Sequence, residues 1–159
     1  MSASVNTGVT IGIVVGLFIM GFILVQNGSI DTSSLHNRLV LKTVKIDNLA
    51  LHVRVAKTPA EHTASLNNIR AIPQNEGMLF VFDTDGRYGI STTNMLFPVD
   101  LLWLDSGGTI LDAQTNVAPG LRDPVQTKVF ARYVLMVNAG TMERDDIIVR
   151  SSVDMSAIR

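Results

Sequence analysis

The chain contains no cysteine, and this absence removes several classes of protein at once. Without thiols there is no disulfide framework, no thiolate zinc site and no cysteine nucleophile. Charge is also scarce, since only 17% of the 159 residues are charged, against about a quarter in a typical soluble domain. The net charge of −1 gives no sign of the basic surface that nucleic-acid-binding domains carry.

The shortage of charge is local, because residues 1–30 contain no charged side chain. After a short tail, residues 1–8, an almost entirely apolar run over residues 9–26 approaches the length of about 20 residues that a membrane-spanning helix needs. A cleaved secretory signal is an alternative, but no basic residue precedes the run and no Ala-x-Ala site follows it. A buried core helix is a further alternative, although the run has no polar face. We predict a retained transmembrane helix and a polar linker over residues 27–37.

Three glycines in this region, Gly8, Gly12 and Gly16, recur at intervals of four residues. This spacing places them on one face of a helix, where a second helix could approach closely and pack. The stripe predicts self-association or docking to a partner protein, although glycine is also simply frequent in membrane helices.

The orientation of the predicted helix depends on the charges beside it. Arg38, Lys42 and Lys45 follow the helix and no Lys or Arg precedes it, so the positive-inside rule alone places the domain in the cytoplasm. Those three side chains can equally belong to the folded domain.

The remainder, residues 38–159, has the pattern of one small β-rich domain. Apolar and polar residues alternate over 39–46 and, more strictly, over 49–55, which predicts two strands with a turn at 47–48. A second hairpin is expected from strands at 99–105 and 109–113 around a glycine turn at 106–108. Three further strands are expected at 77–82, 131–137 and 147–149.

Fewer helices are expected than strands. Thr58, Pro59 and Glu61 predict a helix start with a capping box, and we expect the helix to continue to about Ile69. A short helical turn is expected at 141–144, and a long loop at 117–128. The predicted fold is mainly β (α+β): a small antiparallel barrel or sandwich with one or two short helices, preceded by one transmembrane helix.

Motifs for known chemistry are absent from the sequence or weak in it. There is no nucleophile elbow, phosphate-binding loop or dinucleotide fingerprint. The three histidines, His36, His52 and His62, share no metal-ligand spacing and are expected to be solvated. The segment 83–86 resembles a calcium loop but lacks its later ligands, so an Asp-Gly turn is the simpler interpretation. We therefore predict no cofactor, no metal and no catalytic residues.

Two charged residues interrupt apolar strands. Asp100 lies within the run 99–105 and Arg132 within 131–137. A charge inside such a run must face water or find a partner. Either both residues line one polar pocket, or each lies on the solvent face of its own strand.

Several segments together resemble one family. Gly77-Met-Leu-Phe-Val-Phe, Asn94, Pro98-Val-Asp-Leu-Leu-Trp-Leu-Asp with Gly108-Thr-Ile, and Ala131-Arg-Tyr-Val-Leu with Ala139-Gly140 are similar in order to the prokaryotic domain of unknown function 192. The resemblance runs from about Leu49 to Val153. It implies a compact β fold that is often exported or membrane-tethered, which favours an extracytoplasmic domain here. It implies no activity.

The chain departs from the family pattern at polar and aromatic positions. Ser65-Leu-Asn-Asn-Ile69 stands where the family usually has Gly-Leu-Met-x-Arg, and Ser91-Thr-Thr-Asn-Met95 stands where it has Trp-Met-Lys-Asn-Thr. Met136 replaces a Glu, and Arg150-Ser151 replaces a Gly-Asp. If these positions form the family's site, this member binds a different ligand or no small molecule.

The sequence thus favours a membrane-tethered, non-catalytic binding or interaction module at the cell envelope, with Asn94, Asp100 and Arg132 as candidate binding residues. One alternative is an accessory subunit of a larger membrane or surface assembly, docked through the glycine stripe. The other is a hydrolase-like enzyme that uses Asp100, a weaker idea because no acid–base partner is evident.

Overall fold

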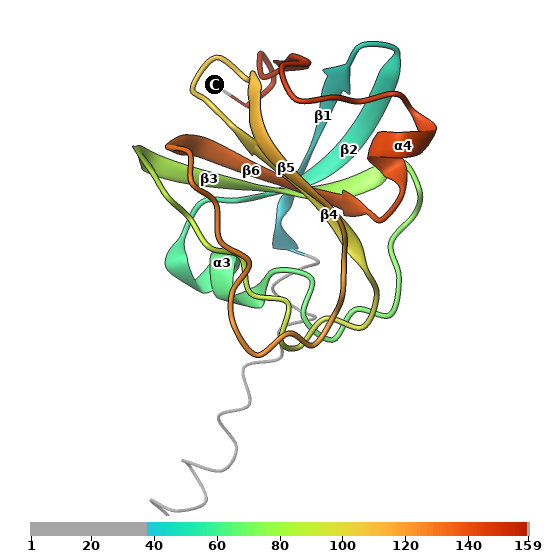
Figure 1. The fold of residues 1–159 in the computed structure, drawn as a ribbon, viewed down its shortest axis with the longest axis vertical. Helices are drawn as coiled ribbons and strands as arrows, with labels where there is room; N and C mark the ends of the chain where they lie inside the picture. The colour runs from blue at the N-terminus through green and yellow to red at the C-terminus, as the bar shows by residue number, and fades with distance from the viewer. Residues whose placement is uncertain (1–37, 159) are drawn as a thin grey trace, which may run out of the picture. The chain divides into compact units, whose positions relative to one another are not determined.

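The computed structural model describes residues 38–158, which form a curled, seven-stranded sheet with two short helices (Figure 1). The sheet resembles a half-barrel, so the prediction of a mainly β domain is confirmed. The elements are β1 (Val40–Ile46), β2 (Leu49–Ala56), α3 (Pro59–Ala64), β3 (Glu76–Gly86), β4 (Val99–Leu104), β5 (Ile110–Val117), β6 (Ala131–Asn138), α4 (Thr141–Arg144) and β7 (Val153–Asp154).

The predicted hairpins form where the alternating patterns place them. β1 and β2 pair antiparallel from Val40 opposite Val55 to Ile46 opposite Leu49, and Asp47 has a φ of 50° in the tight turn. β4 and β5 form the second hairpin, in which Asp105 Oδ1 accepts hydrogen bonds from the backbone N–H groups of Gly107 and Thr109. Both hairpins confirm the sequence prediction.

The strand order is β5-β4-β6-β3-β2-β1-β7, and one pair is parallel. β2 and β3 run in the same direction, with Val53 opposite Gly77 and Val55 opposite Leu79. The prediction of a wholly antiparallel sheet is therefore wrong. A parallel pair needs a crossover connection, and residues 57–75, which include α3, supply it.

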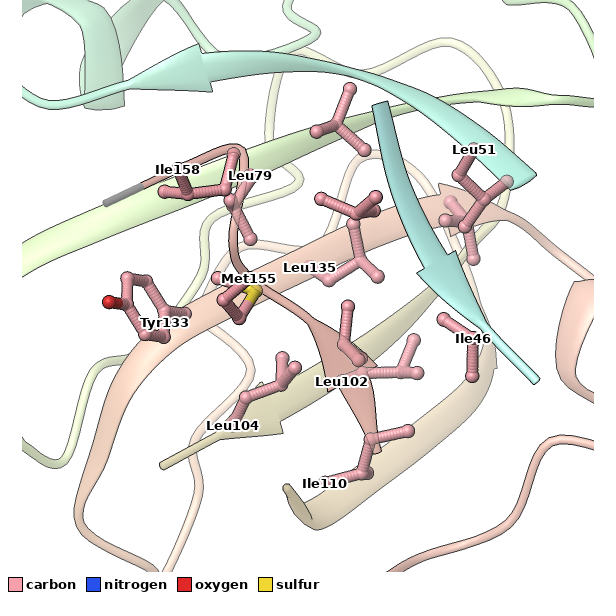
Figure 2. Close-up of a cluster of buried hydrophobic side chains, with 14 of the residues drawn as sticks. Ile46, Leu51, Leu79, Leu102, Leu104, Ile110, Tyr133, Leu135, Met155 and Ile158 are labelled. Atoms are coloured by element: carbon pink, nitrogen blue, oxygen red, sulfur yellow. The ribbon is translucent and has the colours of Figure 1, made fainter. Parts of the chain in front are cut away.

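The sheet packs a hydrophobic core on each face. The first core contains Leu79, Leu102 and Leu135, and Figure 2 shows these side chains directed toward a common centre together with Ile46 and Met155. Met142 of α4 and the C-terminal segment cover this face. The second core contains the fully buried Trp103 and nearly buried Phe80, and Leu66, just after α3, packs there.

The curl brings the start of β5 beside the C-terminal segment. Ile110 N donates to Ser151 O over 3.0 Å, and Val153 N donates to Gly108 O over 2.8 Å. Gly108 has a φ of +95°, and a Cβ atom there would lie 2.2 Å from Val153 O. Only glycine fits this close approach, so it lets the two ends of the sheet meet.

Three local predictions are wrong. α3 begins at the predicted cap but ends at Ala64, not at Ile69, because the chain turns sharply at Ser65. The segment 83–86 is not a turn but the end of β3, which rejoins β6 through Gly86 opposite Ala131 after an irregularity. Residues 147–149 are not a strand, and the last strand is β7.

The predicted transmembrane helix at 9–26, the glycine stripe and the linker at 27–37 lie outside the described residues. Within residues 38–158, no helix has both the length and the apolar character needed to cross a membrane.

Candidate functional site

A half-open cavity of about 340 Å³ lies beside α3 on the second-core side of the sheet. α3 and the turn that ends it form one wall, β3 forms another, and the segment 89–94 forms the third. The lining residues are His62, Thr63, Ser65, Asn67, Phe80, Phe82, Gly89, Ile90, Ser91 and Asn94. We call this cavity the Ser65–Asn94 pocket; it contains Asn94, one of the three predicted binding residues.

Ser65 is the most unusual residue of the pocket. α3 starts with the capping box of Thr58 and Glu61, and it stops where Ser65 N donates to Glu61 O over 3.0 Å. The backbone of Ser65 has a φ of 44° and a ψ of −140°, in a region that favours glycine. Its hydroxyl is buried and has no hydrogen-bond partner among the described residues. Ser65 thus combines backbone strain with an unsatisfied polar group.

The wall that carries Asn94 is fixed by hydrogen bonds. Asn68 N, from the chain just after Ser65, donates to Asn94 O over 2.8 Å. The buried Thr92 donates from Oγ1 to Ala118 O over 3.0 Å, and its carbonyl accepts from Gly120 N over 2.7 Å. The two segments that depart from the family pattern, 65–69 and 91–95, are therefore neighbours in space.

Stacked aromatic rings join the β3 wall to the start of the segment 89–94. Phe82 and Tyr88 stack with centroids 3.5 Å apart and planes within 5°, while the His62 ring lies 4.7 Å from Phe82 in a tilted arrangement. Trp103 Nε1 donates to Tyr88 O over 2.8 Å, which ties this wall to the second core.

His62 is half-buried, so part of its ring is shielded from water. Its Nε2 lies 3.2 Å from Ala56 O. A carbonyl oxygen only accepts, so Nε2 carries a proton, and in the neutral imidazole Nδ1 is then an acceptor.

Asp100 lies elsewhere, fully buried on the first-core side with Leu102 and Leu104. Its two carboxylate oxygens accept hydrogen bonds from Asn116 N over 2.8 Å and Met142 N over 3.0 Å. The interpretation that Asp100 lies on a solvent face is therefore wrong. Its carboxylate ties the end of β5 and the start of α4 to β4.

Arg132 has a different set of partners. Its Nε donates to Asp85 Oδ1 over 2.7 Å, and Nη1 donates to Asp83 O over 2.8 Å. The bond to Asp85 raises the pKa of the Arg132 guanidinium. Asp100 lies opposite Val137 on β6, five residues from Arg132, which corresponds to roughly 16 Å along a strand. The structure does not bring Asn94, Asp100 and Arg132 into one pocket.

Sequence reasoning missed Ser65, Asn67, Phe82 and Ser91 as members of a site. A serine within a stretch predicted to be helical gives no indication of a positive φ. The only indication in the sequence was indirect: 65–69 and 91–95, the two segments that depart from the family pattern, both contribute residues to the pocket.

The fold and site define a class: a small, curled β-sheet domain whose one face carries an uncharged pocket. Within that class the chain belongs to the domain of unknown function 192 family, described as "Uncharacterized ACR", whose model matches residues 42–155. This confirms the resemblance. A search of the curated proteins found no match.

Two crystal structures are similar to this chain. One is a "putative transcription regulator" from Sinorhizobium meliloti 1021, with a TM-score of 0.70 and 25% sequence identity, covering 73% of this chain and 94% of that one. The other is a protein of unknown function from Novosphingobium aromaticivorans DSM 12444, with a TM-score of 0.70 and 20% identity, covering 73% and 86%. The second similarity supports the fold alone.

Proposed function

We propose that this protein is a membrane-tethered, non-catalytic binding module of the prokaryotic cell envelope, and that its ligand occupies the Ser65–Asn94 pocket. The observation that carries the proposal is Ser65, a residue of the pocket lining whose buried hydroxyl has no partner in the described residues. Strained and unsatisfied residues persist in folded proteins mainly where function requires them. A bound ligand would supply the missing hydrogen bond.

The surroundings of Ser65 favour binding over catalysis. A serine nucleophile needs an adjacent base within hydrogen-bond reach. His62 is the only titratable side chain among the lining residues, yet it bonds to Ala56 O and makes no hydrogen bond with Ser65. Asp100, the residue of the hydrolase alternative, lies on the other side of the sheet with both oxygens engaged.

Tethering and location rest on the sequence. The apolar run at 9–26 supports a retained membrane helix, and membership of a family that is often exported favours an extracytoplasmic domain. The description of the S. meliloti protein as a regulator does not lead us to propose DNA binding, because the net charge of this chain is −1.

Native mass spectrometry of the full chain tests the binding proposal. The protein would be extracted from its own membranes in a mild detergent and compared with Ser65→Gly prepared identically. We expect the wild-type protein to retain a small-molecule adduct that the variant loses. The absence of any adduct, or its equal retention by the variant, would contradict the proposal.

The tether has its own test. Intact-mass analysis of the membrane fraction should give the full-length chain, and protease added to spheroplasts should digest the domain. A mature chain that begins after about residue 26 would show a cleaved signal, and protection until lysis would place the domain in the cytoplasm.

A further inference from the structure

The residues that line the Ser65–Asn94 pocket carry no formal charge. None of them is Asp, Glu, Lys or Arg, and His62, counted as neutral at pH 7, is the only ionisable side chain among them. A charged ligand would leave its charge in the pocket without a counter-ion, which is unfavourable. The pocket therefore selects an uncharged ligand.

The pocket offers both hydrogen-bond donors and hydrogen-bond acceptors to a ligand. Asn67 Nδ2 donates to Thr63 O over 2.8 Å, which leaves Asn67 Oδ1 as an acceptor, and His62 Nδ1 is a second acceptor. Ser65 offers a hydroxyl donor, and Asn94 offers an amide with both donors and an acceptor. A hydroxyl group both donates and accepts hydrogen bonds through one oxygen. A ligand with several hydroxyl groups therefore matches the donors and acceptors of the pocket.

The rest of the lining is apolar and rigid. Phe80, Phe82 and Ile90 contribute carbon surface, and the stacked Tyr88 and the tilted His62 fix the ring of Phe82. Such carbon surface packs favourably against the C–H groups of a ligand. A sugar ring presents C–H groups together with a rim of hydroxyls, whereas a linear polyol would lose more conformational entropy on binding.

We propose that the ligand of the Ser65–Asn94 pocket is an uncharged sugar ring, either free or at the end of a glycan. The inference rests on the proposed binding function and specifies its ligand class. The cavity of about 340 Å³ lies at the small end of the range of roughly 300–1,000 Å³ for ligand pockets, which suits a monosaccharide unit. Ser65 donates to a ligand hydroxyl, and Asn67 and Asn94 bind its neighbours.

Matched sugars test the proposal by nuclear magnetic resonance titration of the full-length ¹⁵N-labelled protein. The detergent must contain no sugar, because a maltoside or glucoside would compete. The neutral probes are glucose, galactose, mannose and N-acetylglucosamine, and the charged probes are glucosamine and glucuronate, which keep the glucose ring. Indole serves as a neutral ring without hydroxyls.

We expect at least one neutral sugar to shift the backbone signals of Ser65, Gly89 and Asn94 saturably. Its charged counterpart should bind roughly tenfold more weakly or worse, a difference of about 1.4 kcal/mol. Ser65→Gly should weaken sugar binding by about tenfold, the contribution of one hydrogen bond. Thr43→Ala, which removes an exposed hydroxyl on β1, should leave it unchanged.

The outcomes separate the two proposals. The sugar assignment would be overturned if a charged sugar bound as tightly or more tightly, or if indole alone shifted the backbone signals of the pocket. Either result would still support the proposal that the pocket binds a ligand. If none of the probes shifts the pocket signals at millimolar concentration, the sugar assignment fails, and native mass spectrometry decides separately whether a pocket ligand exists. Sugar binding that Ser65→Gly leaves intact would also overturn the assignment.

Discussion

Asp100 and Ser65 are both buried polar residues, on opposite sides of one sheet, and they differ in how they are satisfied. The Asp100 carboxylate accepts two backbone hydrogen bonds. The Ser65 hydroxyl has no partner in the described residues, and its backbone is strained. The Asp100 carboxylate therefore stabilises the first-core side, whereas Ser65 costs stability at the point where the pocket lies.

The largest effect is expected for Asp100→Ala. The substitution leaves the N–H of Met142 buried without an acceptor and frees that of Asn116. We expect a loss of about 2–4 kcal/mol from the free energy of unfolding. Urea denaturation followed by the fluorescence of Trp103, the only tryptophan, measures it. Asp100→Asn keeps one acceptor and should lose less, and an unchanged stability would show that the carboxylate is not the tie we infer.

Trp103→Phe should have the next largest effect. It removes the donor to Tyr88 O and reduces the volume of a fully buried side chain. We expect a loss of about 1–3 kcal/mol, measured by circular dichroism during urea denaturation. The pocket signals of Gly89 and Ile90 should shift as well. If they do not move, the wall of the pocket does not depend on this hydrogen bond.

A smaller, pH-dependent effect is expected at the start of α3. Backbone N–H groups of Lys57 and Thr58 hold the pKa of the Glu61 carboxyl below its ordinary value of 4.5. The stabilisation is therefore complete above about pH 4.5 and is lost as the pH falls through the lower, folded-state pKa. Glu61→Gln should destabilise by under about 1 kcal/mol at neutral pH, and the difference should vanish in acid. A difference that is independent of pH would contradict a charged cap.

The last comparison predicts no effect: Asp100 and Arg132 should show no coupling in the free energy of unfolding. Their partners are separate, and residues that share no contacts have additive effects. The double variant Asp100→Ala/Arg132→Ala should lose the sum of the two single losses. A clear departure from additivity would indicate that the two charges interact in solution.

Local sequence patterns predicted the elements whose structure depends mainly on residues close together in the chain. The alternation in 49–55, the glycine turn at 106–108 and the capping box at Thr58 were sufficient for β2, the β4–β5 hairpin and the start of α3. The strand through 83–86 was missed because Asp-Gly is typical of turns. Ile148 and Val149 have β-forming side chains, but both are exposed outside any strand.

The site was harder to predict because it depends on contacts between distant segments. Asn94 alone was identified, through the family resemblance. Ser65 reaches the pocket only because α3 ends there at a positive φ, and no local pattern indicates that ending. Asp100 was recognised as unusual, but its backbone partners, Asn116 and Met142, come from parts of the chain that only the folded sheet brings together.

The free energy of unfolding of Ser65→Gly tests the central claim most directly. Glycine relieves the backbone strain, of about 1–3 kcal/mol, and removes an unsatisfied hydroxyl, against a loss of about 0.5–1 kcal/mol for its greater freedom when unfolded. Ser65→Ala, which removes only the hydroxyl, separates the two contributions. The account predicts that Ser65→Gly is more stable than the wild-type protein and loses its pocket ligand. A variant that is less stable, or that keeps the ligand, would contradict the claim that Ser65 is retained for binding.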